Sequence, residues 1–420
     1  MSRPAAVRID DLDDPRFPVE MQPVVDGLAA MAEQISFEPD AMMRTAAEQT
    51  GLDDFGDMGF VERLTVISDA LKNEARLGTV GTLTNGGMLI NLLKNRLLVE
   101  DLIRHHPEIL EIEIARPIVV CGLPRTGTTH LHNLMAADPK LRSLPYWESL
   151  EPVLARAEQP APGEPDPRIG RTDLALNLVN GLMPLFPRMH EMTVEHVHEE
   201  IQLLAIDFSS MLFETIAPMP SWRDHFIAHD QRPHYAYLKK VLQVLTWLRG
   251  GERWVLKTPQ HIEQFGPLLE TFPDATFVVT HRDPIAVTAS VTTMLSYTAR
   301  MSQAKPDPFA VAGYWADRLE RMLRACVRDR DLLPDAQTID VPFDAFMADD
   351  VAMVGRIYEV AGQPMDDESR AAMERFMADH PRGKHGSIVY DFAQLGIDPD
   401  ERRKALDFYV ERFGVTLEDR

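Results

Sequence analysis

The sequence predicts an α/β protein in which a central parallel sheet lies between two layers of helices. Short apolar runs, each suited to one buried strand, occur at 118–121, 253–257, 275–280 and 338–341. Helical patterns separate these runs, and strands that alternate with helices form parallel sheets covered on both faces. The first run is followed by a glycine-bracketed loop and a helical pattern, an arrangement that presents backbone N–H groups to an anion. We therefore expect a three-layer fold with an anion site.

Composition and charge restrict the class of protein further. The chain has 420 residues, of which 45% are hydrophobic and 26% charged, as in soluble globular proteins. A formal net charge of −22 and a pI near 5.0 argue against a nucleic-acid partner, although a local cluster of Arg and Lys can still bind an anion. Cys121 and Cys326 are the only cysteines, which excludes a disulfide framework. The N-terminus has no signal-peptide pattern and the apolar stretch 201–219 contains two acidic residues, so we expect a cytoplasmic protein without a transmembrane segment.

The pattern divides the chain into an N-terminal helical part and a larger α/β part. Residues 1–112 are expected to form a helical cap, beginning with a polar, proline-rich and loosely held arm of about 25 residues. Helices in this part are expected at 41–50, 60–77 and 88–105. The last of them carries leucines at helical spacing, which is typical of a helix packed in a core. Residues 113–420 form the α/β domain, with a mostly helical insertion at about 143–250.

Gly122 and Gly127 bracket the loop that follows the first strand. Four residues separate the two glycines, which is the spacing of a P-loop, so the predicted fold is P-loop-like. A P-loop continues with Lys and then Ser or Thr, whereas Thr128 and Thr129 stand here and Arg125 is the nearest cation. A site that holds a terminal phosphate without a magnesium-bound triphosphate fits these residues. The alternative is a turn that merely connects the strand to the helix.

Lys257 ends the second predicted strand, and His261 follows four residues later. Thr258 is expected to cap a helix that begins with Pro259, which places His261 in the first turn. The positive end of a helix disfavours a further positive charge, so this imidazole should stay neutral and able to accept a proton. Lys257 should point into the crevice where open α/β sheets bind ligands. A surface histidine and a solvated lysine are the alternative.

Arg282 follows the third strand and precedes a second pair of capping residue and proline. Its guanidinium suits a phosphate oxyanion, and Ser290, two turns into the same helix, can add a hydroxyl. Arg125, Lys257 and Arg282 thus each stand after the carboxyl end of a strand. Because these ends share one edge of a parallel sheet, we expect the three cations around one site. Taken alone, Arg282 is explained equally well as an arginine that caps neighbouring residues.

Two motifs in this order and at this separation resemble a known family. Pro124-Arg-Thr-Gly-Thr-Thr129 resembles the 5′-phosphosulfate loop of the sulfotransferases that use 3′-phosphoadenosine 5′-phosphosulfate (PAPS). Arg282, followed eight residues later by Ser290, resembles their 3′-phosphate motif. The pattern is closest to the bacterial branch of this superfamily over about residues 115–400, and the N-terminal helices also resemble that branch. The resemblance implies transfer of the sulfuryl group of PAPS to a hydroxyl, with release of adenosine 3′,5′-bisphosphate.

The resemblance also assigns the donor site. The 5′-phosphosulfate would be held by the loop residues Arg125, Thr126, Gly127, Thr128 and Thr129. The 3′-phosphate would be held by Arg282 and Ser290, with Arg382 and Lys384 from a late basic segment.

This chain departs from the family pattern at three positions. Arg125 stands where many members have Lys, which replaces a point charge by a fork. His130 stands where a Trp often stacks on adenine, so His130 is the residue expected beside the nucleotide in this chain. Pro259 stands where better-known members have the base histidine, and here the histidine comes two residues later.

The implied reaction needs positioning and charge stabilisation more than covalent chemistry by the protein. Lys257 is expected near the oxygen that bridges sulfur and phosphate, supported by Arg125 and the loop amides. The base that takes the acceptor's proton is His261 or Glu200, with His261 preferred. Glu200 belongs to His196-Val-His-Glu-Glu200, which mimics a metal cluster but lacks the i, i+4 histidine pair of a zincin, so no metal is expected.

The acceptor pocket is expected to come from the insertion. Its candidate lining residues are Tyr146, Trp147, Met183, Phe186 and Met211. Methionine and aromatic side chains favour an acceptor with an apolar body that carries a hydroxyl, whether a small molecule, a lipid or a sugar derivative. Two other functions stay open: an ATP-using P-loop phosphotransferase, against which the missing Lys-Ser/Thr pair counts, and a non-catalytic nucleotide-binding protein on the same fold.

Overall fold

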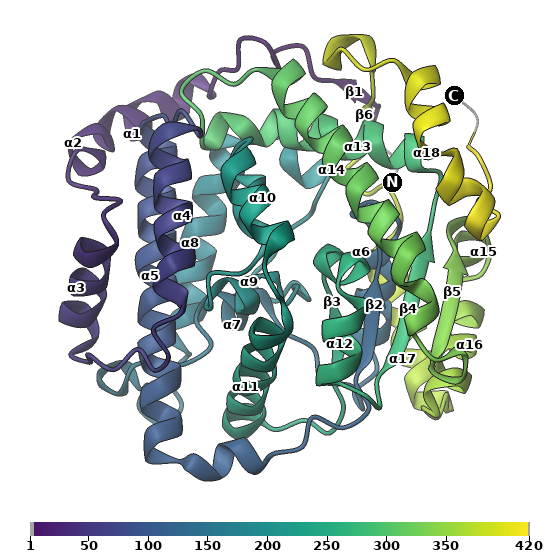
Figure 1. Ribbon diagram of the computed structural model, residues 1–420, viewed down its shortest axis with the longest axis horizontal. Helices are drawn as coiled ribbons and strands as arrows, with labels where there is room; N and C mark the ends of the chain where they lie inside the picture. Colours follow the sequence, from purple (N-terminus) through teal and green to yellow (C-terminus); the bar gives the residue numbers. More distant parts are fainter. Residues whose placement is uncertain (1–3, 419–420) are drawn as a thin grey trace.

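The computed structural model describes residues 4–418, and a parallel sheet of four strands lies at its centre (Figure 1). The strands run in the order β3-β2-β4-β5. They span Ile118–Cys121 (β2), Val255–Lys257 (β3), Thr276–His281 (β4) and Thr338–Pro342 (β5). Ile118 is in register with Val255 on one side and with Thr276 on the other. The predicted strands are therefore confirmed, with bounds that differ by one or two residues.

The two faces of the sheet bury alternate side chains. Val119, Cys121 and Phe277 belong to the larger core, which contains helices on one face. These helices are α11 (Arg232–Arg249), α12 (Phe265–Thr271), α13 (Pro284–Thr298) and α14 (Pro308–Asp329). Val120 and Val278 belong to the second core, on the opposite face. Its helices are α6 (Thr128–Ala136), α15 (Phe343–Ala348), α16 (Asp350–Ala361) and α17 (Asp367–Asp379). Since successive side chains of a strand point to opposite faces, this alternation establishes the three-layer α/β fold.

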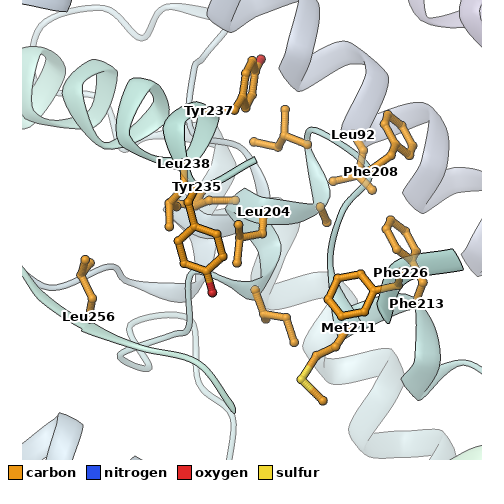
Figure 2. Close-up of a cluster of buried hydrophobic side chains, with 14 of the residues drawn as sticks. Leu92, Leu204, Phe208, Met211, Phe213, Phe226, Tyr235, Tyr237, Leu238 and Leu256 are labelled. Atoms are coloured by element: carbon orange, nitrogen blue, oxygen red, sulfur yellow. The ribbon is translucent and has the colours of Figure 1, made fainter. Parts of the chain in front are cut away.

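Three N-terminal helices share the larger core with the sheet: α3 (Pro39–Thr50), α4 (Phe60–Asn73) and α5 (Thr79–His105). They are preceded by two short helices without buried residues, α1 (Gln22–Gly27) and α2 (Ala29–Ala32), of which α2 packs on α5. In Figure 1 they form the purple and blue side of the molecule, away from β5. Figure 2 shows where the two sides meet: Leu92 of α5 belongs to the same buried cluster as Tyr235 of α11 and Leu256 of β3. The cap is therefore packed on the α/β part through continuous apolar contact.

Two predicted helix bounds in this region are wrong. The helix expected to reach residue 77 ends at Asn73, because the chain turns at Arg76, which has a positive φ of 51°. The helix expected to begin at residue 88 begins at Thr79. Its first turns contain Gly81, where a Cβ would lie 1.9 Å from the carbonyl oxygen of Ser302. Glycines needed for this close approach hide the apolar pattern from which helices are predicted.

The start of the chain is held more firmly than expected. Strand β1 (Val7–Arg8) pairs in parallel with β6 (Ile388–Val389), although more than 300 residues separate them. Ile9 and Leu12 are buried at 2% and 1% exposure, and Arg300 reaches Asp11 at 2.8 Å. The prediction of a loosely held arm is therefore wrong for residues 7–12.

The insertion between α6 and β3 is mostly helical. It contains α7 (Tyr146–Leu150), α8 (Pro167–Leu182), α9 (Ile201–Ala205), α10 (Pro220–Ala228) and α11. The last helix of the chain is α18 (Pro399–Phe413), which packs on α13 and α14. Across residues 4–418, each helix is too short or too polar to span a bilayer.

Candidate active site

A cavity of about 1140 Å³ opens beyond the carboxyl ends of β2 and β3. Its wall combines the loop after β2, the insertion around residues 183–202, α13 and the segment 380–386. These segments are far apart in sequence. The parallel sheet brings them together because every strand delivers its following loop to the same edge.

The loop after β2 has the shape that a phosphate cradle needs. Gly127 has a positive φ of 84° and directly precedes α6, and Arg125 also has a positive φ, of 70°. Gly122 must be glycine, because a Cβ there would lie 1.9 Å from Thr280 Oγ1. Thr126 is only 2% exposed, and its hydroxyl donates to the carbonyl of Leu123 at 2.7 Å. The Thr126 side chain therefore shapes the loop, whereas Arg125, Gly127, Thr128 and Thr129 line the cavity.

Arg125, Ser290 and Arg282 lie together, as expected. The Arg125 guanidinium donates to Ser290 Oγ at 2.9 Å, and Arg282 donates to the backbone carbonyl of Arg125 at 2.7 Å. Ser290 in turn donates to the hydroxyl of Tyr390 at 2.9 Å. The Arg282 guanidinium stacks over the Phe343 ring at 4.0 Å. Sequence reasoning missed Tyr390 and Phe343, which lie in segments without a phosphate-binding pattern.

Carboxylates already pair with several of these cations. Glu418, near the C-terminus, accepts two hydrogen bonds from Arg282, at 2.5 and 2.8 Å. Arg382 pairs with Asp350, whose other oxygen lies 2.8 Å from Nε2 of His130. Arg282 and Arg382 are therefore both held in ion pairs with carboxylates of the protein itself.

Lys384 also lines the cavity, and it pairs with Glu191 at 2.7 Å. His130 packs against Phe346 with ring centres 5.6 Å apart. Of the five residues of the predicted nucleotide side, Arg282, Arg382, Lys384 and His130 line the same cavity as the loop, whereas Ser290 is buried behind Arg125.

Lys257 lies at the end of β3 and is 2% exposed. Its ammonium lies 3.4 Å from Thr129 Oγ1 and pairs with the carboxylate of Glu199. Its backbone N–H donates to both carboxylate oxygens of Glu200, at 2.8 and 2.9 Å. Lys257 therefore reaches the first turn of α6, but it lies just behind Thr129 and Glu199, which line the cavity, and does not line the crevice itself.

The two residues expected to supply the base do not line the cavity. His261 is fully buried in the short 3₁₀ turn Pro259–Glu263, and its Nδ1 lies 2.9 Å from the hydroxyl of Tyr235. Glu200 is also fully buried, 3.4 Å from His261 Nε2. Thr258 forms no side-chain cap, so the turn does not have the helical geometry assumed for it. Glu200 supports the end of β3 through the backbone N–H of Lys257, and the role of either side chain in proton transfer stays a prediction.

Three histidines line the cavity near Lys257, and sequence reasoning gave none of them a role at the site. They are His190, His196 and His198. The His196 ring lies 5.5 Å from that of His190 and 6.1 Å from that of His198. Burial, reinforced by the charge of Lys257, lowers the pKa of His196 to about 4. Burial lowers the pKa of His190 and of His198 well below the ordinary value. These three rings are therefore uncharged near pH 7.

No group of three His, Cys, Asp or Glu side chains within residues 4–418 is arranged to hold a metal ion. The His-x-His segment instead contributes two of the neutral rings described above.

Four of the five predicted acceptor-side residues line the cavity: Tyr146, Met183, Phe186 and Met211. Trp147 does not, because its ring is sandwiched between the guanidinium groups of Arg168 and Arg249, at 4.5 and 4.9 Å. Further apolar lining comes from α8 of the insertion and from helices outside it. The α8 residues are Leu176 and Val179, and those outside the insertion are Met88, Val291, Met294, Leu295, Met301 and Trp315. Their helical spacing is also that of ordinary core residues, so no sequence pattern distinguishes them.

The fold and this cavity define a P-loop-like α/β protein with a cluster of cationic side chains at the carboxyl ends of its strands. Residues 117–367 match the model of the sulfotransferase family. Because this match covers more than half of the chain, the chain belongs to the sulfotransferase family.

Relatives and solved structures agree with this assignment. A protein of Mycobacterium bovis named omega-hydroxy-beta-dihydromenaquinone-9 sulfotransferase Stf3 is 22% identical over 309 residues, covering 70% of this chain and 74% of that protein. The crystal structure of sulfotransferase STF1 from Mycobacterium tuberculosis is 29% identical with a TM-score of 0.75, covering 87% of this chain and 97% of that one. That of sulfotransferase STF9 from Mycobacterium avium is 26% identical with a TM-score of 0.80, covering 91% and 98%.

Proposed function

We propose that this protein uses PAPS to sulfate a hydroxyl on an acceptor with an apolar body, and releases adenosine 3′,5′-bisphosphate. The observation that carries this proposal is the hydrogen-bonded network that joins Arg125 to Ser290 and to Arg282, in which both arginines line one cavity. It connects the loop suited to a 5′-phosphosulfate with the residues suited to a 3′-phosphate. A nucleotide with phosphates at both ends fits such a site better than ATP does.

The cavity wall supplies the contacts that each part of PAPS requires. Arg125, Gly127, Thr128 and Thr129 surround the place for the 5′-phosphosulfate, where the start of α6 adds its positive dipole end. Arg282 and Ser290 hold the 3′-phosphate. Arg382, Lys384 and His130 border the nucleotide on the far side of the loop.

Lys257 is the residue we assign to the leaving group. When the bond between sulfur and the bridging oxygen breaks, negative charge develops on that oxygen. An ammonium in a site from which water is largely excluded stabilises such charge strongly, because the local dielectric constant is low. Lys257 is 2% exposed and lies 3.4 Å from Thr129 Oγ1 in the loop helix, which fits this role.

The acceptor side of the cavity favours an apolar molecule. Part of the wall is built by α5, α13 and the turn 211–215. Polar side chains there donate their hydrogen bonds to backbone carbonyls of the same helix or turn, so these donors are not free for a ligand. Asn85 donates to the carbonyl of Gly81 at 2.7 Å, and Thr215 to that of Leu212 at 2.7 Å. A sugar would find few partners there, whereas methionine side chains adapt to varied apolar shapes. The relative Stf3 is named for a hydroxylated menaquinone derivative, which is an acceptor of this chemical kind.

Ligand binding and transfer assays test the proposal. Adenosine 3′,5′-bisphosphate should raise the melting temperature, whereas magnesium-ATP should not. The reverse result would favour an ATP-using phosphotransferase. Arg282→Ala removes a charge-assisted contact of about 1.5–3 kcal/mol and should weaken bisphosphate binding roughly 10- to 100-fold. An unchanged affinity would refute the 3′-phosphate site.

Transfer of labelled sulfate to a panel of long-chain alcohols, sterols, phenols and sugars then tests the activity and the acceptor. Product with the apolar alcohols supports the acceptor class. Tight bisphosphate binding without transfer to any member of the panel would favour a non-catalytic nucleotide-binding protein.

A further inference from the structure

Glu199 and Glu200 are neighbours in the chain, but they engage opposite ends of Lys257. Glu200 is fully buried and accepts the backbone N–H of Lys257 with both oxygens. Glu199 lines the cavity, keeps 16% of its side chain exposed and pairs with the ammonium of Lys257. Helix α9 begins only at Ile201, so the two carboxylates are not fixed on one helical face.

The ammonium of Lys257 marks the place where the bond to sulfur would break. It lies 3.4 Å from Thr129 Oγ1, in the first turn of the helix that follows the phosphate loop. In the proposed function this cation faces the bridging oxygen of the donor. A carboxylate that contacts the same ammonium therefore stands next to the sulfuryl group and to the hydroxyl that attacks it.

We propose that Glu199 is the general base of the transfer, an inference that rests on the proposed function. Its carboxylate takes the proton of the acceptor hydroxyl while the acceptor oxygen forms its bond to sulfur. The bond between sulfur and the bridging phosphate oxygen breaks, and its electron pair stays on the bisphosphate. Lys257 stabilises the charge on that oxygen.

The other carboxylates of the same cavity wall are held away from this position. Glu191 is bound by Lys384 and His385, at 2.7 and 3.0 Å. Glu195 accepts a hydrogen bond from the indole of Trp147 at 3.3 Å. Glu199, in contrast, pairs with the cation that the donor's leaving group would claim. Donor binding therefore releases this carboxylate beside the reacting atoms.

Glu199→Gln tests the role, because it keeps the size of the side chain and removes its basicity. The matched control is Glu195→Gln, which removes the same charge from the same wall. Three acceptors are compared at mildly alkaline pH: water, by hydrolysis of PAPS in every assay, 1-dodecanol, and 4-nitrophenol, whose hydroxyl is largely ionised under these conditions. In Glu199→Gln, PAPS hydrolysis and transfer to 1-dodecanol should fall about 10²–10⁴-fold, the usual contribution of a general base. Transfer to 4-nitrophenol should fall far less, and Glu195→Gln should stay close to wild type throughout.

Two results would overturn the assignment. One is unchanged PAPS hydrolysis in Glu199→Gln. The other is an equal loss with every acceptor, because removal of a base matters only where a proton must leave. Bisphosphate affinity separates this inference from the proposed function. A wild-type protein that does not bind adenosine 3′,5′-bisphosphate contradicts the function itself, whereas normal binding with unaffected hydrolysis contradicts only the role of Glu199.

Discussion

Glu418 occupies the Arg282 fork at which a 3′-phosphate is expected. Its two oxygens accept from Arg282 at 2.5 and 2.8 Å, and its backbone N–H donates to Asp283 at 2.9 Å. Thr416, in the same tail, donates to Asp344 at 2.9 Å. A phosphate that binds Arg282 must first displace this carboxylate. We therefore predict that Glu418→Gln tightens the binding of adenosine 3′,5′-bisphosphate.

The size of the effect follows from the exposure of the pair. The side chains of Arg282 and Glu418 are 21% and 37% exposed, so solvent screens their attraction. Ion pairs of this kind contribute up to about 1 kcal/mol, which corresponds to at most about a fivefold lower Kd for the bisphosphate. The gain should shrink as the salt concentration rises, because salt weakens the competing pair in the wild type.

Titration calorimetry with two nucleotides measures this prediction. Adenosine 5′-monophosphate lacks the 3′-phosphate, so its affinity should be the same in Glu418→Gln and in the wild type. Glu411→Gln, an exposed change of the same charge on α18, should leave both affinities unchanged. Weaker bisphosphate binding in Glu418→Gln would refute the reasoning, since it would mean that the tail supports the site instead of competing for it.

Three further predictions concern the loop and the cavity wall. Ser290→Ala removes the acceptor of Arg125 at 2.9 Å and should weaken bisphosphate binding by about 1 kcal/mol, measured by calorimetry. Gly122→Ala places a Cβ 1.9 Å from Thr280 Oγ1 and should lower the free energy of unfolding by about 1–3 kcal/mol, measured by urea denaturation. The pKa of His196 is lowered to about 4, so between pH 6.5 and pH 4 the unfolded chain binds a proton that the folded protein refuses. The free energy of unfolding should therefore decrease as the pH is lowered through that window, and the decrease should be less steep in His196→Gln.

Each of these three predictions has a result that would contradict it. Normal bisphosphate affinity in Ser290→Ala would remove that hydroxyl from the site. For the loop, Gly170→Ala in α8 is the control, since a Cβ there meets nothing within 4 Å, and equal stability of the two alanine variants would contradict the clash. Parallel pH profiles of His196→Gln and the wild type would show that other buried histidines carry the dependence.

The grouping of the predicted donor-site cations could be foreseen from the sequence because it follows from local rules. Four apolar runs and their helices determine a parallel sheet, and such a sheet gathers the ends of its strands at one edge. Arg125, Lys257 and Arg282 each follow a strand, so their convergence needed no knowledge of the insertion. Ser290 followed because it lies two turns into a helix whose start was marked by a cap and a proline, and Asp283 does accept the N–H of Ile285 at 2.8 Å.

The acceptor side of the site could not be predicted from the sequence, because it depends on contacts between distant segments. Glu200 was the second candidate for the base, but α9 begins one residue after it, and Glu199 is the carboxylate that lines the cavity. His261 is enclosed by Tyr235 of α11, a contact that no local pattern encodes. The competing carboxylate of Glu418 comes from the last residues of the chain, which carry no motif.

The acidic composition acts within the site as well as over the whole chain. Of the five cations predicted to hold the donor, four are paired with carboxylates: Lys257 with Glu199, Arg282 with Glu418, Arg382 with Asp350 and Lys384 with Glu191. Arg125 differs, because its partners in the described part of the chain are the Ser290 hydroxyl and the carbonyl of Met189. Among these five cations, Arg125 is thus the one whose charge is not neutralised by an ion pair within residues 4–418. In a protein of net charge −22, we expect an incoming anion to be attracted to this guanidinium first. The other four can bind a donor only by exchanging one anion for another. This exchange disfavours ligands with a single phosphate, which replace too few of these pairs, and it favours a nucleotide that is charged at both ends.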